Sequence, residues 1–201
     1  MPNHTLDSLA DYYNKTISKY GNSRKALMWN SHFSQTVRYE ILCDQLNQQE
    51  YSICDVGCGC GDLFHYIKYH QLPFDYTGID ISANMIVAAQ TAYPAGIFRC
   101  LSLDEIVINH SFDCIMASGI FNLRMKDHDN TIFNIIKTMI RCANDQVRFN
   151  ILTDTYKQSL ATSDFVYTNI DVLYNRLKPL VRRITLVRDY LPHDITFYLE
   201  K

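Results

Sequence analysis

The strongest signal in the chain is Ser52-Ile53-Cys54-Asp55-Val56-Gly57-Cys58-Gly59-Cys60-Gly61-Asp62-Leu63. An apolar run there leads into three alternating glycines, and a helical pattern follows them. Glycines at such a turn let the backbone bend tightly and approach a ligand closely. A dinucleotide loop of the pattern G-x-G-x-x-G would need a glycine at position 62, where Asp62 instead places an anion that repels pyrophosphate. The Gly-Lys-Ser/Thr of a phosphate-binding P-loop does not follow either. The loop therefore predicts a ligand that lies directly against the backbone and carries no phosphate.

Short apolar runs alternate with helical patterns from Tyr51 onward. The runs predict strands at Tyr51–Val56, Phe74–Asp80, Ile97–Leu101, Phe112–Ala117 and Gln146–Leu152. The helical patterns lie at Asp62–Tyr69, Ala83–Ala92 and Asp127–Ala143. This alternation is typical of a parallel sheet covered on both faces. The chain ends differently, because the strand-like runs Arg183–Asp189 and Asp194–Glu200 are joined by a turn and predict an antiparallel hairpin.

The residues before the glycine loop are expected to form two helices. Thr5 can cap a first helix that ends at Gly21, and a second helix is expected to start near Asn30 or Ser31. Apolar residues recur at helical spacing in both segments. We therefore expect a helical cap ahead of the sheet.

Composition and charge narrow the class of protein. The chain has 201 residues, of which 47% are apolar and 20% charged, and its net charge is −2. The apolar fraction excludes intrinsic disorder, and the balanced charge provides no global basic field for nucleic acid or acidic membranes. No internal repeat and no linker rich in Pro, Gly or Ser divides the sequence. We expect one domain over 1–201, with the helical cap in 1–47 and the sheet in 48–201.

The seven cysteines do not predict a disulfide framework or a metal site. Most of them fall within apolar stretches, where a thiol packs as a small hydrophobe. Cys58-Gly59-Cys60 lacks the second Cys or Cys/His pair that a structural zinc site needs. No apolar run approaches the roughly 20 residues of a membrane helix, and Met1–Thr5 lacks the pattern of a secretory signal. We expect a cytoplasmic protein with no membrane partner.

A second signal follows the glycine loop in Tyr76-Thr77-Gly78-Ile79-Asp80-Ile81-Ser82. Asp80 stands at the carboxyl end of the second predicted strand, which is where open α/β sheets bind ligands. A carboxylate there can accept hydrogen bonds from both hydroxyls of a ribose. The alternative is that Asp80 only caps the helix starting at Ala83, a role that Ser82 can also fill. The neighbouring glycine loop favours the ribose role.

The two signals together resemble the class I S-adenosylmethionine-dependent methyltransferases. The resemblance rests on Asp55-Val56-Gly57-Cys58-Gly59-Cys60-Gly61 and Gly78-Ile79-Asp80-Ile81-Ser82-Ala83-Asn84-Met85-Ile86, and it extends over roughly Tyr51 to Lys201. It implies an α/β fold with a Rossmann-like, doubly wound, seven-stranded and mostly parallel sheet, a C-terminal antiparallel β-hairpin and an N-terminal helical cap. It also implies S-adenosyl-L-methionine as the cofactor.

The resemblance assigns binding roles to several residues. It places the glycine loop against the methionine part of the cofactor, through Asp55, Gly57, Cys58, Gly59 and Gly61. It places Asp80 on the ribose and Ile81 beside the adenine.

The chain departs from the family after the third strand. The family often carries Gly-Asp there, but this chain has Leu101 and Ser102, so adenine recognition is expected from backbone groups or from the Ser102 hydroxyl. At the end of the fourth strand, Ala117 and Ser118 are expected beside the cofactor's methyl group. That segment lacks the Asn/Asp-Pro-Pro-Tyr/Phe and Pro-Cys motifs, which disfavours exocyclic amines of DNA, protein amides and cytosine C5 as acceptors.

No catalytic residue is assigned from the sequence. His32, His193 and Tyr167 are candidate general bases, and no motif fixes any of them. In small-molecule methyltransferases the region before the sheet forms a lid over the cofactor. Trp29 is expected to close the pocket, and Arg38 to pair with the methionine carboxylate in the bidentate manner that guanidinium favours. Trp29 and Arg38 have structural alternatives, a buried aromatic and a solvated helix charge.

The function that these features favour is methyl transfer to a small-molecule acceptor by in-line displacement. An RNA or protein acceptor is the first alternative, supported by one basic cluster at Arg176, Lys178, Arg182 and Arg183, which is more simply a solvated helix face. A non-catalytic, cofactor-binding regulatory domain is the second. We expect a small-molecule partner rather than nucleic acid.

Overall fold

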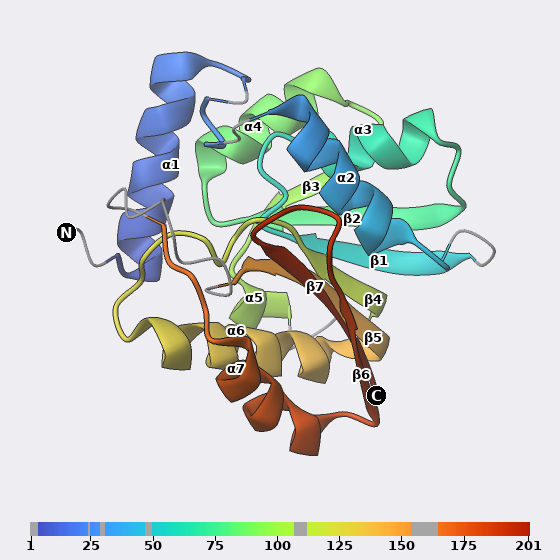
Figure 1. The fold of residues 1–201 in the computed structure, drawn as a ribbon. Helices are drawn as coiled ribbons and strands as arrows, with labels where there is room; N and C mark the ends of the chain where they lie inside the picture. The colour runs from blue at the N-terminus through green and yellow to red at the C-terminus, as the bar shows by residue number, and fades with distance from the viewer. Residues whose placement is uncertain (1–3, 24, 29–30, 47–49, 107–111, 154–164) are drawn as a thin grey trace.

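The computed structural model describes residues 4–23, 25–28, 31–46, 50–106, 112–153 and 165–201. It contains a seven-stranded sheet in the order β3-β2-β1-β4-β5-β7-β6 (Figure 1). The strands are β1 (Tyr51–Val56), β2 (Phe74–Asp80), β3 (Ile97–Cys100), β4 (Phe112–Ala117), β5 (Ala143–Leu152), β6 (Arg183–Val187) and β7 (Asp194–Glu200). Strands β1 to β5 pair in parallel, and β7 lies antiparallel between β5 and β6. The predicted parallel sheet and the C-terminal antiparallel hairpin are both confirmed.

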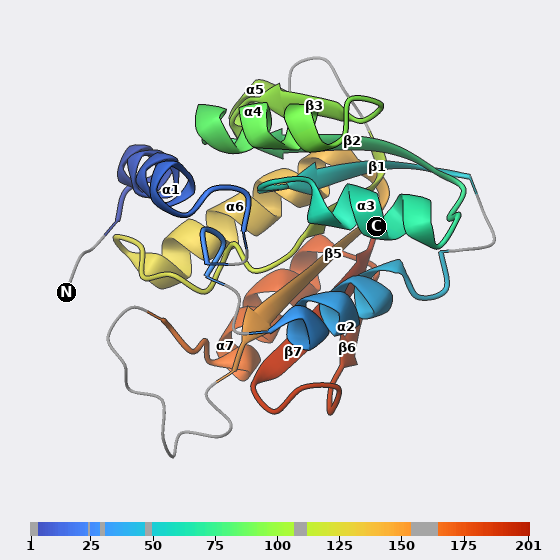
Figure 2. The same cartoon turned by 90° about the horizontal axis from the view of Figure 1, so that it is seen from above.

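Helices cover both faces of this sheet (Figures 1 and 2). The described helices are α1 (Leu6–Tyr20), α2 (His32–Cys43), α3 (Asp62–Tyr69), α4 (Ala83–Ala92), α5 (Leu103–Ile106), α6 (His128–Cys142), α7 (Ile170–Leu177) and the 3₁₀ turn η2 (Lys178–Leu180). Helices α2, α3 and α4 lie on one face, and α6 and α7 lie on the other. None of these described helices has the length and apolarity to cross a bilayer.

The central strands are buried on both faces because alternate side chains enter two separate cores. On β1, Ile53 packs with residues of α2, α3 and α4, while Cys54 packs with residues of α6 and α7. On β4, Cys114 belongs to the same core as Ile53, and Ile115 belongs to the same core as Cys54. Two-sided burial explains why these strands appear in the sequence as continuous apolar runs.

The two N-terminal helices are present but lie far from each other in Figure 2. Thr5 caps α1 through its side chain and Gly21 ends it, while Ser31 caps α2, as the sequence predicts. Helix α1 packs against α4, whereas α2 packs against α3, β5 and β7. Of the two, α1 is the helix that lies beside α4 above the carboxyl ends of the strands.

Candidate active site

A cavity of about 360 Å³ lies at the carboxyl ends of β1, β2 and β4. The glycine loop after β1, Asp80 at the end of β2 and Ser118 after β4 all line it. Helix α1 and the turn at Leu27–Met28 cover it from the N-terminal side. The cavity therefore occupies the edge where parallel α/β sheets bind ligands.

The glycine loop is held in a conformation that only glycine adopts readily. Gly57, Gly59 and Gly61 have φ values of +73°, +54° and +86°. The backbone N–H groups of Gly57 and Cys58 both donate to the carbonyl of Ile79, at 2.8 and 3.0 Å. A Cβ atom on Gly57 would lie 2.3 Å from a methyl group of Ile120. The loop therefore forms a cradle that side chains at these positions would fill.

Gly59→Ala is expected to weaken ligand binding more than it destabilises the fold. A Cβ at this position lies 2.8 Å from the flexible end of Leu27, and the left-handed backbone costs a non-glycine residue about 1–2 kcal/mol. Denaturant unfolding should show a loss of that size, and calorimetric titration should show at least a tenfold weaker affinity for the ligand. Gly21→Ala is the control, because Gly21 also has positive φ but lies outside the cavity with open space around it. Equal affinities for Gly59→Ala and wild type would contradict the prediction.

Asp80 organises the loop from the end of β2. Its Oδ2 atom accepts from the Gly59 N–H at 2.9 Å, and its Oδ1 atom accepts from the Ser82 N–H at 2.8 Å. Burial raises the pKa of this carboxyl, although the backbone hydrogen bonds act in the opposite direction. The cap of α4 is Ser82, whose side chain accepts from Met85. The structure thus gives the capping role to Ser82 and leaves Asp80 lining the cavity.

Asp55 lies beneath the glycine loop with one carboxylate oxygen unsatisfied. It is 2% exposed, and its Oδ2 atom accepts from the Tyr76 hydroxyl at 2.7 Å. Its Oδ1 atom is buried without a hydrogen-bond partner. Burial raises the pKa of Asp55 to about 7. A buried carboxylate with a free oxygen in a cavity wall favours a ligand that brings a positive charge or a hydrogen-bond donor.

The wall beyond β2 is built by the segment after β3. The backbone N–H of Leu101 donates to the carbonyl of Asp80 at 3.1 Å, which holds this segment beside Ile81. Leu101, Ser102 and Ile81 all line the cavity. The Ser102 hydroxyl donates to Glu105 at 2.8 Å, so its oxygen keeps free acceptor capacity.

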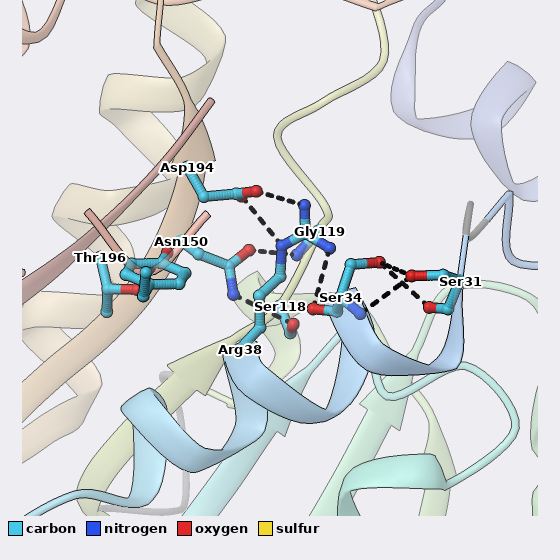
Figure 3. A network of polar contacts seen from close by, with 9 residues as sticks. Ser31, Ser34, Arg38, Ser118, Gly119, Asn150, Asp194 and Thr196 are labelled. Carbon is cyan, nitrogen blue, oxygen red and sulfur yellow. Dashed lines mark hydrogen bonds and ion pairs between the residues drawn. The ribbon is translucent and has the colours of Figure 1, made fainter. Parts of the chain in front are cut away.

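The loop after β4 is fixed by a buried asparagine of β5 (Figure 3). Asn150 is 0% exposed, donates from Nδ2 to the Ser118 hydroxyl at 3.1 Å and accepts at Oδ1 from the Gly119 N–H at 2.9 Å. Both ends of its amide are therefore used to hold the loop against the sheet. Ser118 and Gly119 line the cavity, whereas Ala117 is fully buried and is absent from its lining.

Arg38 is placed elsewhere than the sequence suggested. Its Nε and Nη2 atoms donate to the two carboxylate oxygens of Asp194, at 2.9 and 2.5 Å, and it is absent from the cavity lining (Figure 3). This bidentate ion pair joins α2 to β7 and buries the guanidinium, so Arg38 is not the solvated helix charge that was the alternative, and the contact with a methionine carboxylate stays a prediction. Helix α2 turns Arg38 toward β7, whereas the next residue, Tyr39, lines the cavity.

Other predicted residues also lie away from the cavity lining. Gly61 begins α3, and a Cβ there would meet Phe98. The candidate bases His32, His193 and Tyr167 do not line the cavity, and the rings of Tyr167 and His193 pack edge to face. Trp29 lies outside the described residues. No catalytic assignment follows from these positions.

The structure adds lining residues that sequence reasoning missed. Helix α1 contributes Leu6, Leu9 and Tyr13, helix α6 contributes Thr131, Asn134, Ile135 and Thr138, and loops contribute Asn122 and Phe165. The α6 residues recur at helical spacing on one face, and three of the four are polar. This polar stripe on an otherwise amphipathic helix could have indicated that α6 lines a cavity.

Comparisons of the sequence with known proteins identify methyltransferases. A family described as "Methyltransferase domain" matches residues 54–145. The chain is similar to "Putative methyltransferase Rv1506c" of Mycobacterium tuberculosis, with 31% identity over an alignment of 159 residues that covers 75% of this chain and 93% of the relative.

Solved structures share the fold at low sequence identity. Magnesium protoporphyrin IX methyltransferase from Synechocystis, with bound SAH, superposes with a TM-score of 0.70 at 14% identity, covering 98% of this chain and 100% of that one. The Burkholderia thailandensis 1,6-didemethyltoxoflavin-N1-methyltransferase, with 1,6-didemethyltoxoflavin and S-adenosylhomocysteine bound, superposes with a TM-score of 0.64 at 15% identity, covering 100% of this chain and 92% of that one.

Proposed function

The chain belongs to the class I S-adenosylmethionine-dependent methyltransferases, and from that membership we propose that it transfers a methyl group from S-adenosylmethionine to a small organic acceptor. The observation that carries the proposal is one cavity that joins the glycine cradle, Asp80 and the unsatisfied oxygen of Asp55.

The residues of the cavity fit the parts of the cofactor. The Asp55 Oδ1 atom would receive the α-ammonium group, which satisfies an oxygen that otherwise has no partner. Asp80 would hold the ribose, and Ile81 with Leu101 and the Ser102 segment would flank the adenine. The cradle formed by Gly57 and Gly59 leaves room for the methionine part beside the backbone.

The sulfonium of the cofactor supplies an activated methyl group, so the protein's task is mainly to orient the reactants. Orientation of this kind lowers a barrier by about 7–11 kcal/mol in favourable cases. The loop after β4 is fixed by Asn150, and α1 covers one side of the cavity. Among the described lining residues there is no histidine, lysine or arginine, and we assign no general base.

A small acceptor fits the covered shape of the cavity better than a macromolecule. Leu6, Leu9 and Tyr13 of α1 and Phe165 line it from above the strand ends. The structural relatives described above act, by their names, on a magnesium porphyrin and on a didemethyltoxoflavin. These observations support a small-molecule acceptor.

The basic cluster does not favour a nucleic-acid acceptor. Arg176 donates to Asn130 at 2.9 Å and lies 4.0 Å over the Phe133 ring. Arg182 and Arg183 both pair with Glu200. These three arginines are therefore engaged within the protein, at sites outside the cavity lining.

The proposal is tested by methyl transfer. Purified protein is incubated with cofactor labelled in the methyl group, together with fractionated metabolites or, separately, with RNA and protein fractions. Label is expected in a metabolite fraction only. Label in RNA or protein would move the acceptor to a macromolecule, and failure of the chain to bind S-adenosylhomocysteine would contradict the proposal as a whole.

Asp55→Asn is expected to weaken cofactor binding while changing how stability depends on pH. The raised pKa of about 7 means that the folded state prefers the protonated carboxyl. This stabilisation is complete below the ordinary pKa near 4 and is lost as the pH rises through 7. Between these limits, the wild-type free energy of unfolding should fall by up to about 1.4 kcal/mol per pH unit relative to the variant.

Urea unfolding from pH 4 to 8 and calorimetric titration with S-adenosylhomocysteine measure the two effects. Asp75→Asn is the matched control, because Asp75 is an exposed carboxylate on the same sheet. A variant with the wild-type pH slope would contradict the raised pKa of Asp55, and a variant with unchanged affinity would remove Asp55 from the proposed ammonium site.

A further inference from the structure

The order of the strands divides the cavity into two ends. Along the edge of the sheet, the order β3-β2-β1-β4-β5 places the segment after β3 and Asp80 on one side of the glycine loop. The loop after β4 lies on the other side, and its Ile120 contacts Gly57. If the nucleoside lies over β2 and β3, as proposed above, then the methyl acceptor lies beyond β4.

We define this second side, the acceptor end, by six lining residues: Leu6, Leu9, Asn122, Leu123, Met125 and Phe165. Backbone bridges tie them together. His4, just before α1, pairs with Met125, and Leu123 pairs with Phe165. The start of α1, the loop after β4 and the segment at Phe165 thus form one continuous wall.

None of the six side chains in the acceptor end carries a charge. Five are apolar, and one is an amide. The two carboxylates that line the cavity, Asp55 and Asp80, belong to β1 and β2. No cation stands among the described residues that line the cavity, and Arg124, between Leu123 and Met125, is absent from that lining, so an anionic acceptor would be a buried unpaired charge, which is strongly disfavoured.

Asn122 is the polar side chain among these six, and its Oδ1 atom has no partner, while Ser118 of the same loop and Thr131, Asn134 and Thr138 of α6 also line the cavity. The residue is 8% exposed, and its Oδ1 atom is buried without a hydrogen bond. Its main-chain carbonyl accepts from the Val166 N–H at 2.8 Å. The backbone is therefore held by Val166, while the side-chain oxygen contributes no hydrogen bond to the fold.

The contrast with Asn150 shows what a structural asparagine looks like in this region. Asn150 uses both its oxygen and its nitrogen to hold Ser118 and Gly119. A buried carbonyl oxygen without a partner destabilises a protein, and such groups are rare in native structures. An unpaired oxygen in the wall of a binding cavity is therefore explained by a ligand that donates to it.

We propose that the methyl acceptor is an uncharged, mainly apolar small molecule whose N–H or O–H group donates a hydrogen bond to Asn122 Oδ1. The inference rests on the proposed function, because it assumes that the cofactor occupies the other end of the cavity. Asn122 is then a positioning residue that sets the orientation of the acceptor, while the apolar wall binds its body.

The experiment uses protein saturated with S-adenosylhomocysteine and three probes that share one bicyclic body. These are 2-naphthol, which has a hydrogen-bond donor, 2-methoxynaphthalene, in which the donor is blocked, and 2-naphthoate, which is anionic. Calorimetric titration at pH 7 should show that 2-naphthol binds about tenfold more tightly than 2-methoxynaphthalene, the effect of one buried hydrogen bond. The anion should bind most weakly of the three.

The variant Asn122→Leu separates this role from a structural one. It should abolish the preference for 2-naphthol, leave the affinity for S-adenosylhomocysteine unchanged and raise the melting temperature, because an apolar side chain replaces an unsatisfied oxygen. A merely structural asparagine would lower the melting temperature when replaced. Asn130→Leu, at an exposed position outside the cavity, is the matched control and should keep the preference.

The outcomes distinguish the inference from the proposed function. If wild-type protein does not bind S-adenosylhomocysteine, the proposed function fails. If it binds, the inference is overturned by equal affinities for 2-naphthol and 2-methoxynaphthalene, by tightest binding of 2-naphthoate, or by binding of none of the probes. A preference for 2-naphthol that survives in Asn122→Leu overturns the role of Asn122.

Discussion

Asp80→Ala is expected to weaken cofactor binding by at least about a hundredfold. A charged hydrogen bond contributes about 1.5–3 kcal/mol, and the proposed ribose contact uses two of them. The substitution also removes the acceptor that holds the Gly59 N–H. The loss therefore combines a missing ligand contact with a glycine loop that is no longer fixed in its binding conformation.

Calorimetric titration with S-adenosylhomocysteine measures this loss, and two further variants separate its parts. Asp80→Asn keeps a side-chain oxygen for the Gly59 N–H but removes the charge, so its affinity should lie between those of wild type and Asp80→Ala. Asp75→Ala removes an exposed carboxylate from the same strand and should bind normally. An Asp80→Ala protein that binds within threefold of wild type would exclude Asp80 from the binding site.

Elements with strong local signals were predicted to within a few residues. Strands β1, β2, β4 and β7 and helices α3 and α4 have the predicted bounds. For the other predicted strands and helices the differences lie at the element ends, as at β5, which begins at Ala143 rather than Gln146. Two of its additional residues, Asn144 and Asp145, are polar, and the third, Ala143, pairs with Phe112 in the neighbouring strand. Hydrogen-bonded pairing with a neighbouring strand cannot be recognised from the sequence of β5 alone.

Two helices on the face of the sheet that α6 covers, α5 and α7, were not predicted from the sequence. Helix α5 spans Leu103–Ile106, which is too short to show a helical period. Helix α7 did have a signal, because Asn169 caps it by accepting from Val172, and Ile170 and Leu177 are buried at helical spacing.

The candidate site was predictable where one short segment defines it. The glycine loop and Asp80 line the cavity because the backbone itself forms that wall. A cover from the N-terminal region was predicted, but the particular residues that α1 and α6 contribute were not, since the helix face that meets a cavity depends on how distant elements pack. Arg38 shows the same limit, because its partner Asp194 lies 156 residues away in the sequence. A guanidinium on a helix indicates neither a ligand nor an ion pair until that partner is known.

Arg38→Ala is expected to destabilise the protein by about 3–5 kcal/mol, a large part of the 5–15 kcal/mol that stabilises a typical domain. Arg38 and Asp194 are 7% and 5% exposed, and removal of the guanidinium leaves the Asp194 carboxylate buried without its partner. Urea unfolding measures the loss. Because Arg38 does not line the cavity, the folded fraction should bind S-adenosylhomocysteine with wild-type affinity.

The double variant Arg38→Met/Asp194→Leu decides between the ion pair and a direct contact with the cofactor. Apolar residues of similar volume often replace a buried ion pair without loss of stability, because neither charge then has to be desolvated. We expect the double variant to recover most of the stability lost in Arg38→Ala and to bind S-adenosylhomocysteine normally. If Arg38 instead contacts the methionine carboxylate, both variants will bind at least tenfold more weakly, whatever their stability. A stable double variant with weak binding would therefore place Arg38 in the cofactor site after all.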